Sequence, residues 1–167
     1  MKSKQKPIIG IMGPGSPNDS EIVNHARKLG REIARMDWIL LTGGRAAGVM
    51  EAAARGASEE GGLTIGILPG NSRNQASSYI QIPVVTGMGN ARNVINILTS
   101  DVIVVCGMGP GTASEVSLAI KMNKPLIMTR VGQTTRNFFD NLSGSEIPHI
   151  ENAEEIVSAI QNLLNPK

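Results

Sequence analysis

The sequence is short of aromatic residues and of charge, and both shortages argue against a nucleic-acid binder. One Trp, one Tyr and two Phe are too few and too scattered to form a platform for stacked bases. Charged residues make up 18% of the chain, and the net charge is only +2. Three lysines lie within residues 1–6, so the rest of the chain is close to neutral. We therefore expect no nucleic-acid partner.

Cysteine, histidine and long apolar runs are equally scarce. Cys106 has no second cysteine with which to form a disulfide, and His25 and His149 do not form a metal-ligand spacing with it. Nowhere do about 18 apolar residues run together, and glycine soon interrupts the apolar run near the N-terminus. We expect a cytoplasmic protein with no metal site and no membrane segment. His25 receives no predicted role.

What the sequence does contain is a regular alternation of apolar β-branched runs and amphipathic stretches. Its 167 residues suit one domain, with residues 1–6 as a basic tail. The alternation predicts an α/β fold with a doubly wound, mostly parallel, Rossmann-like sheet and helices on both faces. Strands are expected at 7–13, 38–42, 63–68, 79–86, 102–105, 125–131 and 149–150, and helices at 20–36, 49–60, 90–100, 112–122, 133–142 and from 152 onwards.

The stretch from Asp101 to Glu115, DVIVVCGMGPGTASE, organises this prediction. An apolar strand runs through a turn containing three glycines and enters a helix that we expect to begin at Thr112. Glycines allow a ligand to approach the backbone closely, and the first N–H groups of a helix favour an anion. We therefore predict a phosphate-bearing ligand over residues 109–112. A simpler alternative is that Thr112 and Glu115 form a capping box, which would explain those two residues but not the glycines.

Two other strands also run into glycine turns, namely Gly13-Pro14-Gly15-Ser16 and Gly43-Gly44-Arg45. If the strands are parallel neighbours, all these turns open at the carboxyl edge of one sheet. The first turn lacks the G-x-G-x-x-G pattern, and the second strand does not end in the acidic residue that holds a ribose in NAD-binding folds. The sequence therefore favours a mononucleotide or a phosphate.

Three features have more than one interpretation. Arg92, at the start of an apolar helix, is either a surface side chain or an anion ligand. The polar segment 71–78 is either a mobile lid or an exposed loop, and the loop is favoured. Pro83 makes the strand around it an edge strand or an irregular segment. The helices at 90–100 and 112–122 are apolar on more than one face, which suggests a homodimer or a higher homo-oligomer.

From Ile8 to about Val131 the chain resembles the family once labelled "possible lysine decarboxylase". That family includes the lonely-guy (LOG) phosphoribohydrolases, which activate cytokinins, and the molybdenum cofactor carrier proteins. Its signature is an Arg at a helix start followed by a strand ending in P-G-G-x-G-T-x-x-E, and here Arg92 precedes the segment GMGPGTASE from Gly107 to Glu115. The stretch GGRAAGVMEAAARGA is similar to an earlier G-G-x-x-G-x-M segment of the family.

The departures from this signature point towards the carrier branch. Gly107 replaces Pro, Met108 replaces the first Gly, and Asn93 stands where the hydrolases have Lys. The segment GNARN, residues 89–93, looks more like the cofactor carriers. A decarboxylase is disfavoured because a pyridoxal Schiff base needs a buried Lys, and the lysines outside the tails fall on or beside expected helix surfaces.

The resemblance implies a protein that holds a nucleoside monophosphate or a phosphorylated pterin such as molybdenum cofactor. It requires no other cofactor; a nucleotide, a phosphate or molybdenum cofactor would be the bound ligand. The alternative is a hydrolase of the N-glycosidic bond of nucleoside 5′-monophosphates, with Arg92 neutralising charge and Glu115 stabilising the oxocarbenium-like transition state. The residues expected to bind phosphate or nucleotide are Gly13, Gly15, Ser16, Gly43, Gly44, Arg45, Arg92, Asn93, Gly107, Met108, Gly109, Pro110, Gly111, Thr112 and Glu115.

Overall fold

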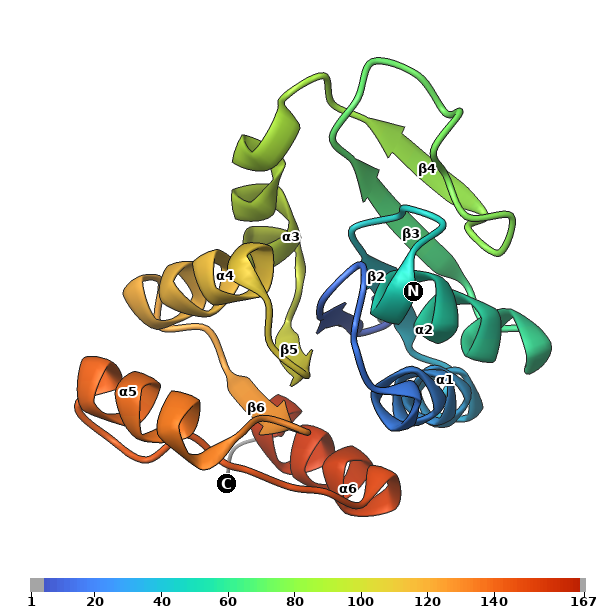
Figure 1. The fold of residues 1–167 in the computed structure, drawn as a ribbon. Coiled ribbons are helices and arrows are strands. Elements are labelled where there is room, and N and C mark those ends of the chain that lie inside the picture. The colour runs from blue at the N-terminus through green and yellow to red at the C-terminus, as the bar shows by residue number, and fades with distance from the viewer. Residues whose placement is uncertain (1–4, 166–167) are drawn as a thin grey trace.

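A computed structural model describes residues 5–165, and its centre is a six-stranded sheet in which every paired strand is parallel (Figure 1). The order across the sheet is β4-β3-β2-β1-β5-β6. This confirms the predicted doubly wound α/β fold. Most of the predicted basic tail lies outside the described residues. The strands are β1 (Ile8–Met12), β2 (Ile39–Thr42), β3 (Thr64–Leu68), β4 (Ile82–Val85), β5 (Val102–Cys106) and β6 (Leu126–Thr129).

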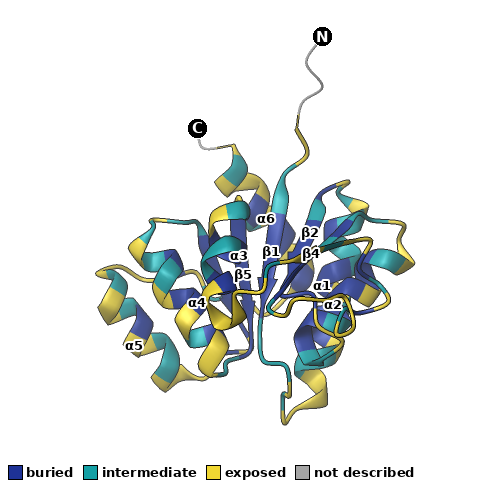
Figure 2. Ribbon diagram, turned by 90° about the horizontal axis from the view of Figure 1, so that it is seen from above, coloured by how far each residue is buried: buried dark blue, intermediate teal, exposed yellow. Residues whose placement is uncertain are grey.

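Helices cover both faces of the sheet and divide the core into two clusters of buried side chains. One cluster lies under α1 (Ser20–Arg35), α2 (Gly48–Glu59) and α6 (Ala153–Leu164). The other lies under α3 (Asn93–Thr99), α4 (Pro110–Lys121) and α5 (Gln133–Ser143). The central strands are therefore buried on both sides, as Figure 2 shows in dark blue, and this explains why they read as continuous apolar runs.

The direction in which successive strands are added to the sheet changes between β1 and β5. The chain moves from β1 through β2 and β3 to β4, and then crosses back to place β5 on the other side of β1. In such sheets the crossover connections diverge at this point and leave a crevice at the carboxyl ends of the strands. The fold therefore places the glycine turns after β1, β2 and β5 around one opening.

The sheet edges differ in detail from the prediction. β4 is an edge strand, as Pro83 predicted, and its Ile82 is 43% exposed. The expected strand at 149–150 is reduced to a single bridge between Met128 and His149.

The helix α3 is shorter than expected, because a 3-10 turn at residues 89–92 precedes it. Leu98 of α3 is 56% exposed, which leaves part of the apolar face of this helix open to solvent.

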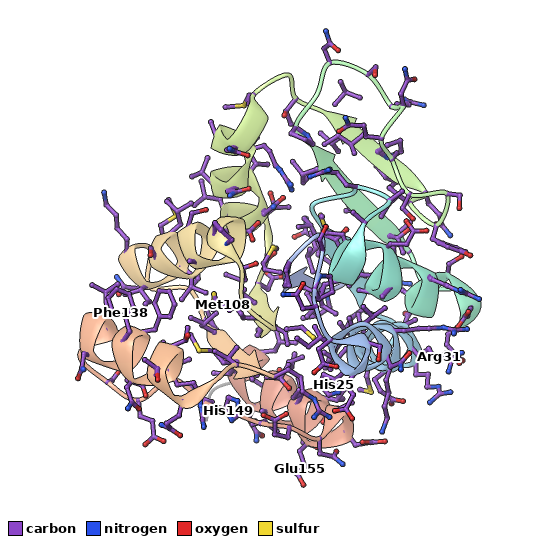
Figure 3. The ribbon with its side chains drawn as sticks, viewed as in Figure 1. His25, Arg31, Met108, Phe138, His149 and Glu155 are labelled. Atoms are coloured by element: carbon purple, nitrogen blue, oxygen red, sulfur yellow. The ribbon has the colours of Figure 1, made fainter. Side chains whose placement is uncertain are left out.

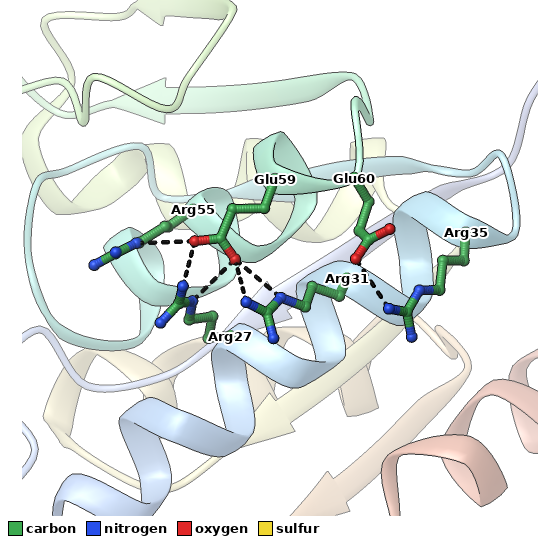
Figure 4. A network of polar contacts seen from close by, with 6 residues as sticks. All are labelled: Arg27, Arg31, Arg35, Arg55, Glu59 and Glu60. Atoms are coloured by element: carbon green, nitrogen blue, oxygen red, sulfur yellow. Dashed lines mark hydrogen bonds and ion pairs between the residues drawn. The ribbon is translucent and has the colours of Figure 1, made fainter.

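The basic face of α1 is paired rather than simply solvated. Arg27 and Arg31 reach across to Glu59 on α2, and Arg55 approaches the same carboxylate from within α2 (Figure 4). These hydrogen bonds, that from Arg27 above all, lower the pKa of Glu59 to about 2. The carboxylate therefore stays ionised across the physiological range and ties the two helices together.

His25 connects α1 to the sheet from inside the core. Its Nε2 atom lies 3.0 Å from Oγ1 of Thr129 at the end of β6, and the residue is only 7% exposed (Figure 3). Burial, and secondarily the charge of Arg130, lower the pKa of His25 to about 4. The neutral imidazole is thus a structural link, which gives this residue the role that the sequence did not reveal.

We predict that His25 makes the fold sensitive to acid. Because its pKa falls on folding, its contribution to stability is complete above pH 6.5 and is lost as the pH falls towards 4. Wild type should lose about 2 kcal/mol more unfolding free energy than His25→Gln between about pH 7 and pH 4.5. Urea unfolding at a series of pH values measures this difference, and parallel pH profiles for the two proteins would show the prediction to be wrong.

Candidate functional site

A pocket of about 590 Å³ opens at the carboxyl ends of β1, β2 and β5. Its walls come from the three glycine turns and from the start of α3, which are far apart in the sequence. The structure brings most of the predicted site residues together here. Those that line the pocket are Gly13, Gly15, Ser16, Gly43, Arg45, Arg92, Asn93, Met108, Gly109, Pro110, Gly111, Thr112 and Glu115.

Of the residues predicted to bind phosphate or nucleotide, Gly44 and Gly107 do not line the pocket. Gly44 has a φ of +76°, and a Cβ there would lie 2.8 Å from the Cα of Gly66 on the neighbouring strand. Gly107 has a φ of +73°, and its N–H donates to the carbonyl of Thr129 at 3.0 Å. The backbone path of the turns therefore requires glycine at both positions.

The sequence prediction missed part of the wall. An apolar group formed by Ile11, Met12, Ile22 and Met50 lies in the pocket together with Met108. Figure 3 marks Met108 at the turn between β5 and α4. Pro14, Pro17, Asn18, Asp19 and Asn90 also line the pocket. Their place in the sequence could have revealed them, because most of these residues lie within or directly beside the glycine turns.

The N-terminus of α4 points its first backbone N–H groups at this pocket. The helix begins at Pro110, two residues earlier than predicted, with Gly109 as its N-cap and no side-chain cap. The first intrahelical bond runs from the N–H of Ala113 to the carbonyl of Gly109 at 2.8 Å. The N–H groups of Gly111 and Thr112 therefore have no partner within the helix, while Pro110 has no N–H to offer.

The capping-box alternative for Thr112 and Glu115 is wrong. Oγ1 of Thr112 is buried and has no hydrogen-bond partner among residues 5–165. Oε1 of Glu115 instead accepts a hydrogen bond of 2.8 Å from Nδ2 of Asn96, a residue of α3. Both side chains face the pocket region, so neither serves to close the end of α4.

Arg92 is buried at the pocket and is not a surface side chain. The residue is 8% exposed, and its Nε and Nη1 atoms have no partner among the described residues. The guanidinium lies against Gly43, where a Cβ would approach Nη1 to 2.3 Å. Burial lowers the pKa of Arg92; the charge of Arg45 lowers it further, and Glu115 raises it.

Glu115 is the buried acidic group beside this arginine. It is 7% exposed, and burial raises the pKa of its carboxyl group, although the hydrogen bond from Asn96 and the charge of Arg92 oppose the shift. In the described part of the chain, Glu115 forms no ion pair with Arg92. The pocket therefore holds a guanidinium and a carboxyl group that do not satisfy each other.

The segment 71–78 is an exposed loop fastened to the second glycine turn. The N–H of Ala46 donates to the carbonyl oxygen of Gln75 at 3.0 Å, and the N–H of Ser77 donates to the carbonyl oxygen of Gly44 at 2.9 Å. The side chains from Asn71 to Gln75, in the first part of the loop, are exposed. These bonds set the path of the backbone at Arg45, whose exposed side chain lies at the pocket.

Two further features of the described residues, 5 to 165, bear on function. None of their helices combines the length and the apolar character needed to cross a membrane. Within the same range, no three or more His, Cys, Asp or Glu side chains gather in a way that could hold a metal ion. The pocket thus offers N–H donors, a guanidinium and amides to a ligand.

The chain belongs to the SLOG cluster4 family, whose model matches residues 6–160. It is 40% identical over 116 residues to an uncharacterized protein of Archaeoglobus fulgidus, a match that covers 70% of this chain and 75% of that protein.

Two solved structures resemble the fold along nearly its whole length. The molybdenum cofactor binding protein from Rippkaea orientalis is 44% identical, with a TM-score of 0.94 over 98% of this chain and 100% of that one. The molybdenum cofactor carrier protein of Chlamydomonas reinhardtii is 45% identical, with a TM-score of 0.90 over 96% of this chain and 99% of that one. Both of these neighbours are described as proteins that bind or carry molybdenum cofactor.

We predict that Arg92 lowers the stability of the ligand-free protein. A buried charge without a partner is unfavourable, so Arg92→Met, which keeps an unbranched apolar stem and removes the charge, should raise the unfolding free energy by about 1 kcal/mol in phosphate-free buffer. Arg45→Met is the matched control, because this arginine is exposed and its replacement should change stability by less than about 0.5 kcal/mol. Denaturant unfolding measures both variants, and a net loss of stability in Arg92→Met would contradict the prediction.

Proposed function

We propose that this protein is a carrier that binds a phosphorylated pterin, with molybdenum cofactor as its cargo, and releases it chemically unchanged. Two close structural neighbours are described as proteins that bind or carry this cofactor, and their identities of 44% and 45% extend over nearly the whole chain. The cofactor is cargo in this proposal, so the pocket needs groups that recognise it but none that change it.

The buried guanidinium of Arg92 is the observation that carries the proposal. Two nitrogens of this buried arginine have no partner in the part of the chain that the structure describes, so the site is prepared for an anion that enters from outside. The free N–H groups of Gly111 and Thr112 and the positive end of the α4 dipole lie on the same pocket. A phosphate monoester placed there would receive hydrogen bonds from both directions.

The remaining walls suit the ring system of a pterin. Met50 and Met108, with Ile22, give the wall an apolar part whose thioethers pack well against a flat ring, and the buried Ile11 and Met12 lie behind it. Asn18 and Asn90 add amide groups able to bond to the ring edge. The volume of about 590 Å³ lies within the range of small-molecule sites, so one compact ligand fills it.

We predict that Arg92→Met binds molybdenum cofactor about 10-fold to 100-fold more weakly than wild type, because a charge-assisted hydrogen bond is lost. Anaerobic titration with released cofactor, followed by the amount retained on the protein after gel filtration, measures this. Arg73→Met is the control, since Arg73 lies in the exposed loop and does not line the pocket. Retention of the cofactor by Arg92→Met at the wild-type level would refute the proposed role of the pocket.

The second candidate is a LOG-type hydrolase of nucleoside 5′-monophosphates, and Glu115 is the observation that favours it. Its carboxyl group lies in the pocket with no ion pair to Arg92 in the described chain, where it could stabilise an oxocarbenium-like transition state. Asp19 is the other acidic residue on the wall, but its Oδ1 accepts from the N–H of Glu21 at 2.8 Å and caps α1. Of the two carboxyl groups that glycosidic hydrolysis usually needs, the pocket thus offers Glu115, whereas that of Asp19 is engaged in capping α1.

Chromatography separates the two candidates. For a carrier we expect no free base when the protein is incubated with a panel of nucleoside 5′-monophosphates, whereas a hydrolase would release base from at least one of them. Glu115→Gln is the control for contaminating activity, because it keeps the side-chain shape and an oxygen for the bond from Asn96. Release of base by wild type, together with its loss in Glu115→Gln, would replace the carrier proposal with the hydrolase.

A further inference from the structure

The first turn of α4 has little of its own to hold it in place. Its N-cap is Gly109, no side chain caps the helix, and Gly111 follows within the same turn. By contrast, α1 and α6 are capped by the side chains of Asp19 and Asn152. Helix ends of this kind fray, and two glycines increase the conformational freedom of the turn.

A relay of two hydrogen bonds fastens this turn to α3. Nδ2 of Asn93 donates to Oγ of Ser114 at 2.8 Å, and Oγ of Ser114 donates to the carbonyl of Gly111 at 2.7 Å. Asn93 is 7% exposed and is the first residue of α3. It directly follows Arg92 in the chain, so one short segment supplies both the guanidinium and the anchor.

The relay acts on the donor that faces the pocket. The carbonyl of Gly111 and the N–H of Thr112 belong to one planar trans peptide group, so they point in opposite directions. Holding the carbonyl towards Ser114 therefore holds the N–H of Thr112 towards the open end of the helix. This N–H is one of the two that precede the first intrahelical bond.

We propose that Asn93 is a positioning residue for the anion site: through Ser114 it fixes the peptide group between Gly111 and Thr112, and it contributes geometry instead of charge. The inference rests on the proposed function, because it assumes that an anion occupies the end of α4.

Binding of inorganic phosphate, followed by NMR titration of backbone amides, tests the relay. Asn93→Ala and Ser114→Ala should each weaken binding by about threefold to tenfold, and the double variant should be no weaker than either single variant, because both belong to one relay. Ser114→Thr keeps the hydroxyl and should restore wild-type binding. Ser117→Ala is the matched control, since Oγ of Ser117 donates to the carbonyl of Ala113 within α4 and, among the described residues, makes no bond to α3.

The salt dependence of binding distinguishes position from charge. Because Asn93 carries no charge, Asn93→Ala should leave the slope of log affinity against log salt unchanged, whereas Arg92→Met should flatten it. A flatter slope in Asn93→Ala, or multiplied losses in the double variant, would overturn the proposal.

Amide hydrogen exchange without ligand separates this inference from the proposed function. The Glu115 amide, whose N–H is the helical donor to the Gly111 carbonyl in α4, should exchange at least about fivefold faster in Asn93→Ala and Ser114→Ala, and at the wild-type rate in Ser117→Ala. Unchanged exchange in the first two variants would overturn the positioning role, whatever binds. Faster exchange in a protein that binds neither phosphate nor cofactor would support the relay and refute the carrier.

Discussion

The buried guanidinium of Arg92 is the constraint around which the pocket is arranged. A largely buried positive charge is unfavourable without a partner, and among the described residues its Nε and Nη1 have none. Gly43 leaves the space that the guanidinium occupies, and Glu115 lies near without pairing. An anion bound in the pocket can therefore supply the partner that the guanidinium lacks.

The doubly wound sheet explains why one pocket gathers such distant segments. Parallel strands end at the same edge, and the change of direction between β1 and β5 keeps their following connections apart. The glycines in these connections then serve two purposes. Gly43 and Gly109 give space at the pocket, whereas Gly44 and Gly107 permit backbone angles that other residues rarely adopt.

Membership of the SLOG cluster4 family accounts for the fold, and the molybdenum cofactor carriers among its structural neighbours direct attention to binding. The carrier and hydrolase candidates need the same helix N-terminus and the same arginine, so the fold alone does not separate them. The difference lies in a few side chains. Asn93 forms a neutral link to α4, and Met108 adds an apolar group to the pocket wall.

The sequence by itself determined most of the order of strands and helices, the choice of an edge strand or an irregular segment at β4, and the gathering of the glycine turns at one edge of the sheet, where the pocket lies. These follow from local signals, namely β-branched runs, the missing N–H of Pro83, and glycines directly after strands. Only the tertiary structure decided that Arg92 is buried and that Gly44 and Gly107 stay out of the pocket. It also decided that Glu115 bonds to Asn96, a residue 19 positions away on another helix. Those outcomes depend on how separate elements pack together, which local sequence patterns do not encode.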